Sequence, residues 1–171
     1  MSQRPDYPHI RRVVTGHDAK NTAKVLIDGP ATNEKYPDAN MISTLIWSTD
    51  AMPADIAIGA SIEDTGNRIL GSAPPVNGTR FAVLDFPPGN KAVTHRTETL
   101  DYVIVLEGEI EMDMDDSTVK LKAGDILIQR GTNHTWMNRS NARCRIAVVL
   151  VDAVPLGIGK ALARDTTAAA H

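Results

Sequence analysis

Two histidines and one aspartate, His95, Asp101 and His134, are the side chains in this sequence best suited to do chemistry. Imidazole and carboxylate groups bind divalent metal ions, and they also act as general acids and bases near neutral pH. His95 and Asp101 lie six residues apart in a run with strand-like alternation, so an extended chain places them on the same face. His134 follows a different strand-like segment, so only a sheet that brings distant strands together could make the three converge.

Short strand-like runs separated by frequent turns predict an all-β fold. The runs lie at 42–47, 80–86, 92–106, 110–114, 119–121, 126–129 and 144–151, and turn-forming residues separate them. No helical periodicity interrupts them, which indicates an antiparallel barrel or jelly roll. Two further apolar runs, at 13–14 and 25–27, predict a β-hairpin ahead of the barrel.

The run from Ala92 to Leu106 predicts one long strand with two different faces. One face carries, in order, His95, Thr97, Thr99, Asp101, Val103 and Val105. This face is polar at one end and apolar at the other, as expected of a barrel interior with a reactive mouth and a packed base. The opposite face has an apolar half that must also be covered, so we expect the N-terminal strands or a second subunit to cover it.

The spacing of glycines, histidines and an acid over residues 89–138 resembles the two signature motifs of the cupin superfamily. The first family motif is a glycine, five residues, His-x-His, three or four residues, Glu, six residues and Gly. The second is Gly, then Pro-x-Gly, two residues, His, three residues and Asn. The matching positions are Gly89, His95, Asp101 and Gly108 in the first motif, and Gly124, Gly131, His134 and Asn138 in the second. Thr97 replaces the second histidine, Asp101 the glutamate and Gln129 the proline.

The resemblance implies a single-domain cupin with a double-stranded β-helix, or jelly-roll, barrel at 80–152. An N-terminal extension at 1–50, including the hairpin, would pack on the barrel or on a partner subunit. An irregular loop at 51–79 would precede the barrel, and a short C-terminal tail at 153–171 would follow it.

The resemblance also implies that His95, Asp101 and His134 are the ligands of a divalent metal ion, Fe, Zn, Mn or Ni. Two imidazoles and one carboxylate are the ligand set associated with non-haem Fe(II), whereas the neutral hydroxyl of Thr97 is a poor ligand. The alternative interpretation is a metal-free pocket in which both histidines form hydrogen bonds and Asp101 is their partner.

The expected function is a metal-dependent enzyme acting on a small organic molecule, as a decarboxylase, dehydratase, isomerase or Fe(II) dioxygenase. The residues expected to contact the substrate are Thr97, Gln129 and Trp136, with ordinary barrel packing as the alternative. No catalytic base is identified, because strand parity turns Glu98 away from His95. One alternative is a non-catalytic cupin that binds a small molecule without metal. Another is a metal-free barrel resembling sugar-nucleotide epimerases, which would require Tyr102 to face inward.

Composition argues against several other classes of protein. The net charge of −3 and a pI near 5.9 disfavour nucleic acid and membrane surfaces as partners. No apolar run approaches the roughly 20 residues that span a bilayer, and no signal peptide is evident, so we expect a cytoplasmic protein. The apolar outer face of the 92–106 run leads us to expect a homodimer. The single cysteine, Cys144, excludes an internal disulfide, and its apolar surroundings predict a buried, unreactive thiol.

Overall fold

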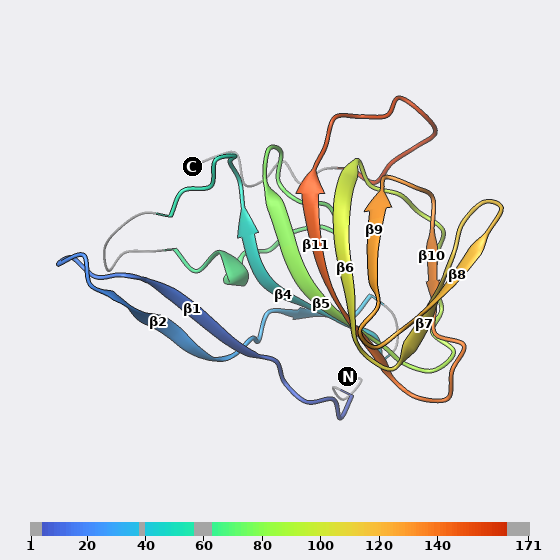
Figure 1. The fold of residues 1–171 in the computed structure, drawn as a ribbon, viewed down its shortest axis with the longest axis horizontal. Coiled ribbons are helices and arrows are strands. Elements are labelled where there is room, and N and C mark those ends of the chain that lie inside the picture. Colours follow the sequence, from blue (N-terminus) through green and yellow to red (C-terminus); the bar gives the residue numbers. More distant parts are fainter. Residues whose placement is uncertain (1–4, 38–39, 57–62, 164–171) are drawn as a thin grey trace.

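The computed structural model describes residues 5–37, 40–56 and 63–163, and these residues form an almost entirely β structure (Figure 1). The strands are β1 (Arg11–His17), β2 (Ala23–Pro30), β3 (Glu34–Lys35), β4 (Ile42–Thr49), β5 (Thr79–Phe86), β6 (Thr99–Glu107), β7 (Glu109–Asp113), β8 (Thr118–Lys122), β9 (Ile126–Arg130), β10 (Thr135–Met137) and β11 (Cys144–Asp152). One 3-10 helix, η1 (Thr65–Asn67), is present in the described residues. None of the helical structure seen in these ranges is long and apolar enough to cross a membrane.

Two antiparallel sheets build the barrel. The larger has the order β3-β4-β5-β11-β6-β9, and the smaller has the order β10-β7-β8. The last strand, β11, lies between β5 and β6, so strands distant in sequence become neighbours. This is the double-stranded β-helix, or jelly roll, predicted from the sequence. β4, which precedes the 51–79 segment, pairs with β5 and extends the larger sheet.

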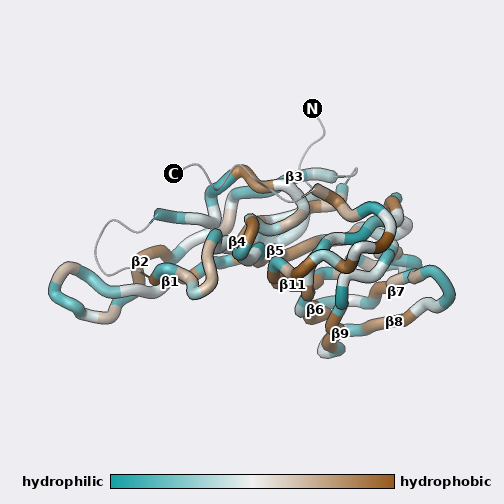
Figure 2. The backbone as a smooth tube through the Cα atoms, turned by 90° about the horizontal axis from the view of Figure 1, so that it is seen from above, coloured by the Kyte–Doolittle hydropathy of each residue, from teal (hydrophilic) through white to brown (hydrophobic). Residues whose placement is uncertain are grey.

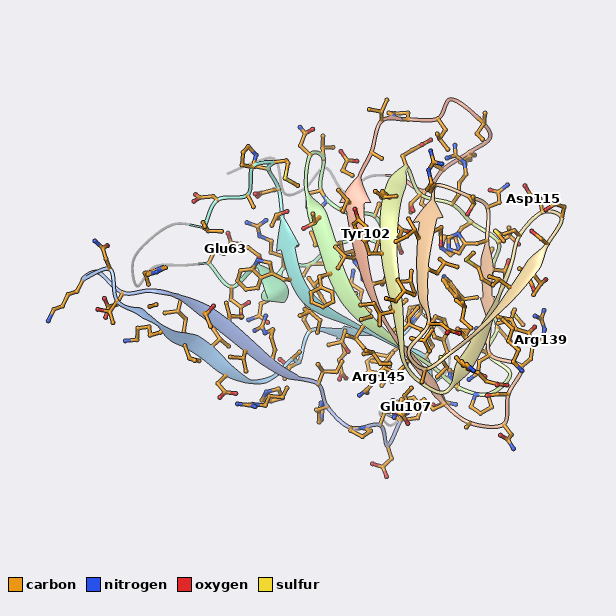
Figure 3. All side chains as sticks on the ribbon, in the orientation of Figure 1. Glu63, Tyr102, Glu107, Asp115, Arg139 and Arg145 are labelled. Atoms are coloured by element: carbon orange, nitrogen blue, oxygen red, sulfur yellow. The ribbon has the colours of Figure 1, made fainter. Side chains whose placement is uncertain are left out.

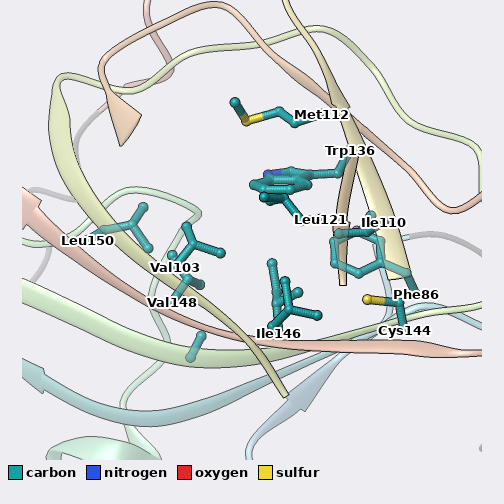
Figure 4. Packing of buried hydrophobic residues seen from close by; sticks show 12 residues of the cluster. Phe86, Val103, Ile110, Met112, Leu121, Trp136, Cys144, Ile146, Val148 and Leu150 are labelled. Atoms are coloured by element: carbon teal, nitrogen blue, oxygen red, sulfur yellow. The ribbon is translucent and has the colours of Figure 1, made fainter. Parts of the chain in front are cut away.

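Apolar side chains from both sheets fill one end of the barrel (Figure 4). The buried cluster consists of Ala82, Phe86, Val103, Val105, Ile110, Met112, Leu121, Trp136, Cys144, Ile146, Val148 and Leu150. The Phe86 and Trp136 rings pack at a centroid distance of 6.5 Å. Cys144 is fully buried, which confirms its predicted burial, and this burial raises the pKa of the thiol to about 12, which disfavours the reactive thiolate.

The strand predicted from Ala92 begins later than predicted. β6 starts at Thr99, and the preceding segment contributes only an isolated bridge between His95 and His134. The backbone N–H of each histidine donates to the carbonyl of the other, at 3.1 and 3.0 Å. Within β6 the predicted alternation is confirmed: the inward side chains Thr99, Asp101, Val103 and Val105 are buried, while Tyr102, Ile104 and Leu106 are exposed.

Two motif positions have structural rather than chemical roles. Gly108 joins β6 to β7 with a positive φ of 76°, and an added Cβ would lie 2.4 Å from the carbonyl oxygen of Arg143. Asn138 is fully buried, and its side-chain amide donates to the carbonyls of Phe86 and Ala142 at 3.0 and 2.8 Å. Both residues hold the connections that let the two sheets face each other.

The β1–β2 hairpin projects from the barrel as an arm (Figures 1 and 2). Its base is fixed by Arg12, a buried side chain that donates to both carboxylate oxygens of Asp64 at 2.7 and 2.6 Å. Asp64 also caps η1 by accepting from the Gly66 N–H at 3.1 Å. The ion pair therefore ties the arm to the segment predicted as an irregular loop, of which residues 57–62 lie outside the described ranges.

Candidate functional site

A cavity of about 310 Å³ lies inside the barrel, above the apolar cluster. Its lining includes all six residues predicted for the site, namely His95, Thr97, Asp101, Gln129, His134 and Trp136. Apolar side chains supply much of the remaining wall: Met41, Leu84, Phe86, Val103, Ile146, Val148 and Leu150. The volume is at the lower end of the roughly 300–1,000 Å³ typical of small-molecule sites.

The two histidines lie next to each other in the cavity wall, with ring centroids 4.5 Å apart and ring planes tilted by 57°. Each ring is held in the same way: its Nδ1 lies close to the backbone carbonyl two residues earlier, 2.9 Å from Val93 for His95 and 3.0 Å from Thr132 for His134. For His95, donation to the carbonyl requires the proton on Nδ1, and the neutral ring then carries its free lone pair on Nε2, which is the state a metal ligand or a base requires. His134 adopts the same tautomer when the Gln129 amide presents its oxygen, and not its N–H, to Nδ1.

Further contacts fix His134 and keep it neutral. The Gln129 side-chain amide lies 2.8 Å from Nδ1, and the Trp136 ring packs edge-on at a centroid distance of 6.1 Å. Burial lowers the pKa of His134 to about 4; the hydrogen bond to Thr132 partly offsets this shift, and His95 adds slightly to it. His134 is thus a neutral imidazole at neutral pH.

Asp101 lies in the same cavity with one oxygen unsatisfied. Its Oδ1 is buried without a hydrogen-bond partner within the described ranges. Burial raises the pKa of Asp101 to about 6, opposed by a hydrogen bond from Thr99 and by the charge of His95. The Thr97 and Thr99 hydroxyls lie 2.6 Å apart, so Thr97 is engaged in the chain of hydroxyls that ends at Asp101. Asp101 is therefore poised to exchange a proton near neutral pH.

The predicted ligands fit a metal ion only in part. The two Nε2 atoms are suitable donors, and the unpartnered Oδ1 of Asp101 is the kind of atom that a cation satisfies. Across residues 5–37, 40–56 and 63–163, however, no three His, Cys, Asp or Glu side chains gather closely enough to hold an ion. The arrangement supports a two-imidazole site with Asp101 beside it, which would bind a divalent ion less tightly than three or four protein ligands.

Sequence reasoning missed two charged residues of the cavity lining, the exposed Lys91 and the buried Arg80. The strand registers place Ser48, Arg80, Leu150, Asp101 and Gln129 on one rung across the larger sheet. Arg80 occupies the first inward position of β5, where Ala82, Leu84 and Phe86 follow at alternate positions. That alternation in RFAVLDF was the available signal, because it assigns the arginine to the same face as the apolar residues.

Other candidate residues lie outside the cavity. Glu98 binds the buried Arg96 at 2.8 Å and accepts from the Leu156 N–H at 2.9 Å, in agreement with the parity argument. His17 ends β1 and is exposed on the arm. Tyr102 is exposed on the outer face, so the epimerase-like interpretation lacks the inward tyrosine it requires.

Comparison with known proteins shows which family the chain resembles. Residues 82–151 match the family model described as Cupin domain. Phomopsin biosynthesis cluster protein C' of Diaporthe leptostromiformis is 34% identical, with the alignment covering 94% of this chain and 90% of that protein. The cupin-domain-containing oxidoreductase srdB of Neurospora crassa is 31% identical, over 90% of this chain and 80% of that protein. The chain belongs to the cupin superfamily.

Among solved structures, the cupin is similar to the crystal structure of a Cupin 2 conserved barrel domain protein from Salinispora arenicola. The two share 17% identity with a TM-score of 0.46, over 69% of this chain and 81% of that chain.

Proposed function

We propose that this cupin is an oxidoreductase that converts a small organic molecule in the barrel cavity, with His95 and His134 as its reactive centre. The observation that supports the proposal is the pair of imidazoles, with ring centroids 4.5 Å apart, each with its Nδ1 next to the carbonyl two residues earlier and both lining a largely apolar cavity. The reaction class follows the relatives named cupin-domain-containing oxidoreductases, such as srdB.

The proposal includes a divalent metal ion, Fe, Zn, Mn or Ni, held by the two imidazoles. When bound, such an ion would act as a Lewis acid toward a substrate oxygen or, in the case of iron, would supply redox chemistry. The partial fit of the ligand set predicts weak binding, so the ion would be lost readily to chelators.

The chain's own side chains orient the substrate and handle protons. The apolar wall excludes water from the bound molecule, and Trp136 and Gln129 hold His134 in place. Asp101, whose pKa lies at about 6, gives or takes a proton at its free Oδ1, and the Thr97–Thr99 hydroxyl chain orients its other oxygen. Asp101 would then be the acid–base group that sequence analysis left unassigned.

Elemental analysis by mass spectrometry tests the metal centre. The protein should be purified without chelator, alongside the His95→Ala/His134→Ala double variant and the matched control His17→Ala, which removes a histidine from the arm. We expect metal in the parent and the control and none in the double variant. Equal metal in all three proteins would show that the two histidines are not the ligands.

A second candidate function is a non-catalytic cupin that binds a small molecule without metal. It is favoured by the failure of the three predicted ligands to gather into one cluster in the described residues. Absence of metal from the parent after incubation with Fe(II), Zn, Mn and Ni, together with retained binding of small molecules, would establish this alternative.

We also propose that the cupin forms a homodimer through the outer face of β6 and β9. The exposed apolar side chains there are Tyr102, Ile104 and Leu106 on β6 and Ile126 and Ile128 on β9. The strand register pairs Tyr102 with Ile128 and Ile104 with Ile126, so the side chains form one patch, bordered at one end by Glu107 and Arg145 (Figure 3). An exposed apolar face of this kind favours pairing with a second copy.

A further inference from the structure

Arg80 is a buried cation in the cavity and has no anionic partner among residues 5–37, 40–56 and 63–163. Its side chain is only 7% exposed and lines the cavity. Its one hydrogen bond runs from Nη2 to the Ser43 hydroxyl at 3.1 Å, and its Nε is buried without a partner within the described part of the chain. A buried guanidinium held by a single neutral hydroxyl has most of its donors left for another group.

The other buried arginines are neutralised by the protein itself. Arg12 pairs with Asp64 at 2.6 Å, and Arg96 pairs with Glu98 at 2.8 Å. In the described part of the chain no such carboxylate lies against Arg80, and burial lowers its pKa to about 10, which still leaves it positively charged at neutral pH. An uncompensated buried charge is unfavourable for folding, so its presence in a cavity suggests that a ligand completes the pair.

The strand register places Arg80 and Asp101 two strands apart on the wall of the cavity. Arg80 is opposite Leu150 on β11, and Leu150 is opposite Asp101 on β6. Two strand spacings of about 4.8 Å therefore separate the Arg80 and Asp101 backbones by about 10 Å. All three side chains line the cavity, and the one between the two charged groups is apolar.

We propose that Arg80 binds a carboxylate of the substrate, so that the molecule converted is a small organic acid with an apolar body. This inference rests on the proposed enzymatic function and names its substrate class. The guanidinium fork matches a carboxylate in two parallel hydrogen bonds, and a single negative charge balances the single positive charge of Arg80. The apolar body of the acid lies along Leu150 and its neighbours, and its reacting end extends toward Asp101 and the histidines.

Calorimetric titration with benzoate and benzamide tests the proposal, because these probes have the same shape and differ in charge. Titrations in EDTA prevent a bound metal from attracting the carboxylate. The parent should bind benzoate at least tenfold more tightly than benzamide. Arg80→Leu should lose this preference, and so should Arg80→Gln, which keeps a polar group beside Ser43. The matched control Arg130→Leu removes an exposed arginine next to Gln129 and should behave as the parent does.

The His95→Ala/His134→Ala variant separates this proposal from the proposed reactive centre. Retained preference for benzoate in that variant supports Arg80 as the anion site, whether or not the histidines hold a metal. Absence of any preference in the parent, or its persistence in Arg80→Leu, overturns the assignment. Loss of the preference in the double-histidine variant alone would place the anion at the imidazoles instead.

Discussion

Asp101 and His134 are two titrating groups whose effects on stability oppose each other. The pKa of Asp101 is raised to about 6, so its stabilising contribution is full below the unfolded value of 3.8 and is lost as pH rises through 6. The pKa of His134 is lowered to about 4, so its contribution is full above the unfolded value of 6.5 and is lost as pH falls through 4. Over pH 4–6.5 the two effects largely cancel.

Replacing either Asp101 or His134 should expose the pH dependence of stability that the remaining group causes. Asp101→Asn is expected to be more stable than the parent at pH 7 and to lose stability on acidification from pH 6.5 to 4, by on the order of 3 kcal/mol. His134→Gln should show the opposite slope. Denaturant unfolding in EDTA at pH 7, 5.5 and 4.5 measures both trends, and parallel curves for parent and variants would contradict the assigned shifts.

Arg80 should reduce the stability of the empty protein. Replacing the unpaired guanidinium with an apolar group of similar size removes the desolvation cost of a buried charge, so Arg80→Leu should stabilise the fold by roughly 1–3 kcal/mol. Arg12→Leu serves as the contrasting variant, because it leaves Asp64 without its partner and should destabilise. Thermal unfolding of the three proteins gives the comparison, and a lower melting temperature for Arg80→Leu would show that the charge is compensated.

At the residue scale, the sequence predicted which side chains line the cavity but not how they pair. The motif spacing and strand parity identified His95, Asp101 and His134, and all three are there. The spacing of residues in the sequence does not show that Asp101 and the two histidines fail to gather into one three-ligand cluster, because this depends on the positions of their side chains. Arg80 was missed because arginine is normally exposed, and its lack of a carboxylate partner becomes visible only in three dimensions.

At the level of elements, the tight connection from β6 to β7 depends on Gly108. An alanine there would combine a positive φ of 76° with a Cβ only 2.4 Å from the Arg143 carbonyl oxygen. We expect Gly108→Ala to destabilise by roughly 2–4 kcal/mol, since strain and overpacking add. Gly89→Ala is the matched control: its φ is 63°, but no atom lies within 4 Å of an added Cβ, so about 1 kcal/mol is expected. Equal losses in urea unfolding would exclude the steric contribution.

Strand prediction succeeded where alternation was continuous and failed where it was not. The runs that became β5, β6 and β11 were evident because one face of each packs on the apolar cluster. Residues 92–98, which were included in the predicted strand, lack that apolar–polar alternation and form only the bridge at His95, because they border the cavity rather than a neighbouring strand. The pattern reports burial on one side and does not report whether a hydrogen-bonding neighbour exists.

For the whole molecule, the testable property is association. Light scattering after size-exclusion chromatography should give a dimer for the parent and a monomer for Ile104→Glu, which places a charge in the middle of the outer apolar patch. Ile69→Glu is the control, because Ile69 is an exposed isoleucine outside the patch, and this variant should remain dimeric. A monomeric parent, or a dimeric Ile104→Glu variant, would rule out this face as the interface.

The reciprocal backbone bridge between His95 and His134 has a consequence for local opening. Two backbone hydrogen bonds, outside any strand ladder, join the two histidines, and the Thr94 and Thr135 hydroxyls form one further contact beside them at 2.7 Å. Such an isolated pair can separate without disrupting the sheets, so its amide protons should exchange with deuterium far sooner than those in the middle of β6. The exchange rates of these two amides would therefore report, atom by atom, how often the mouth of the cavity opens to admit a molecule.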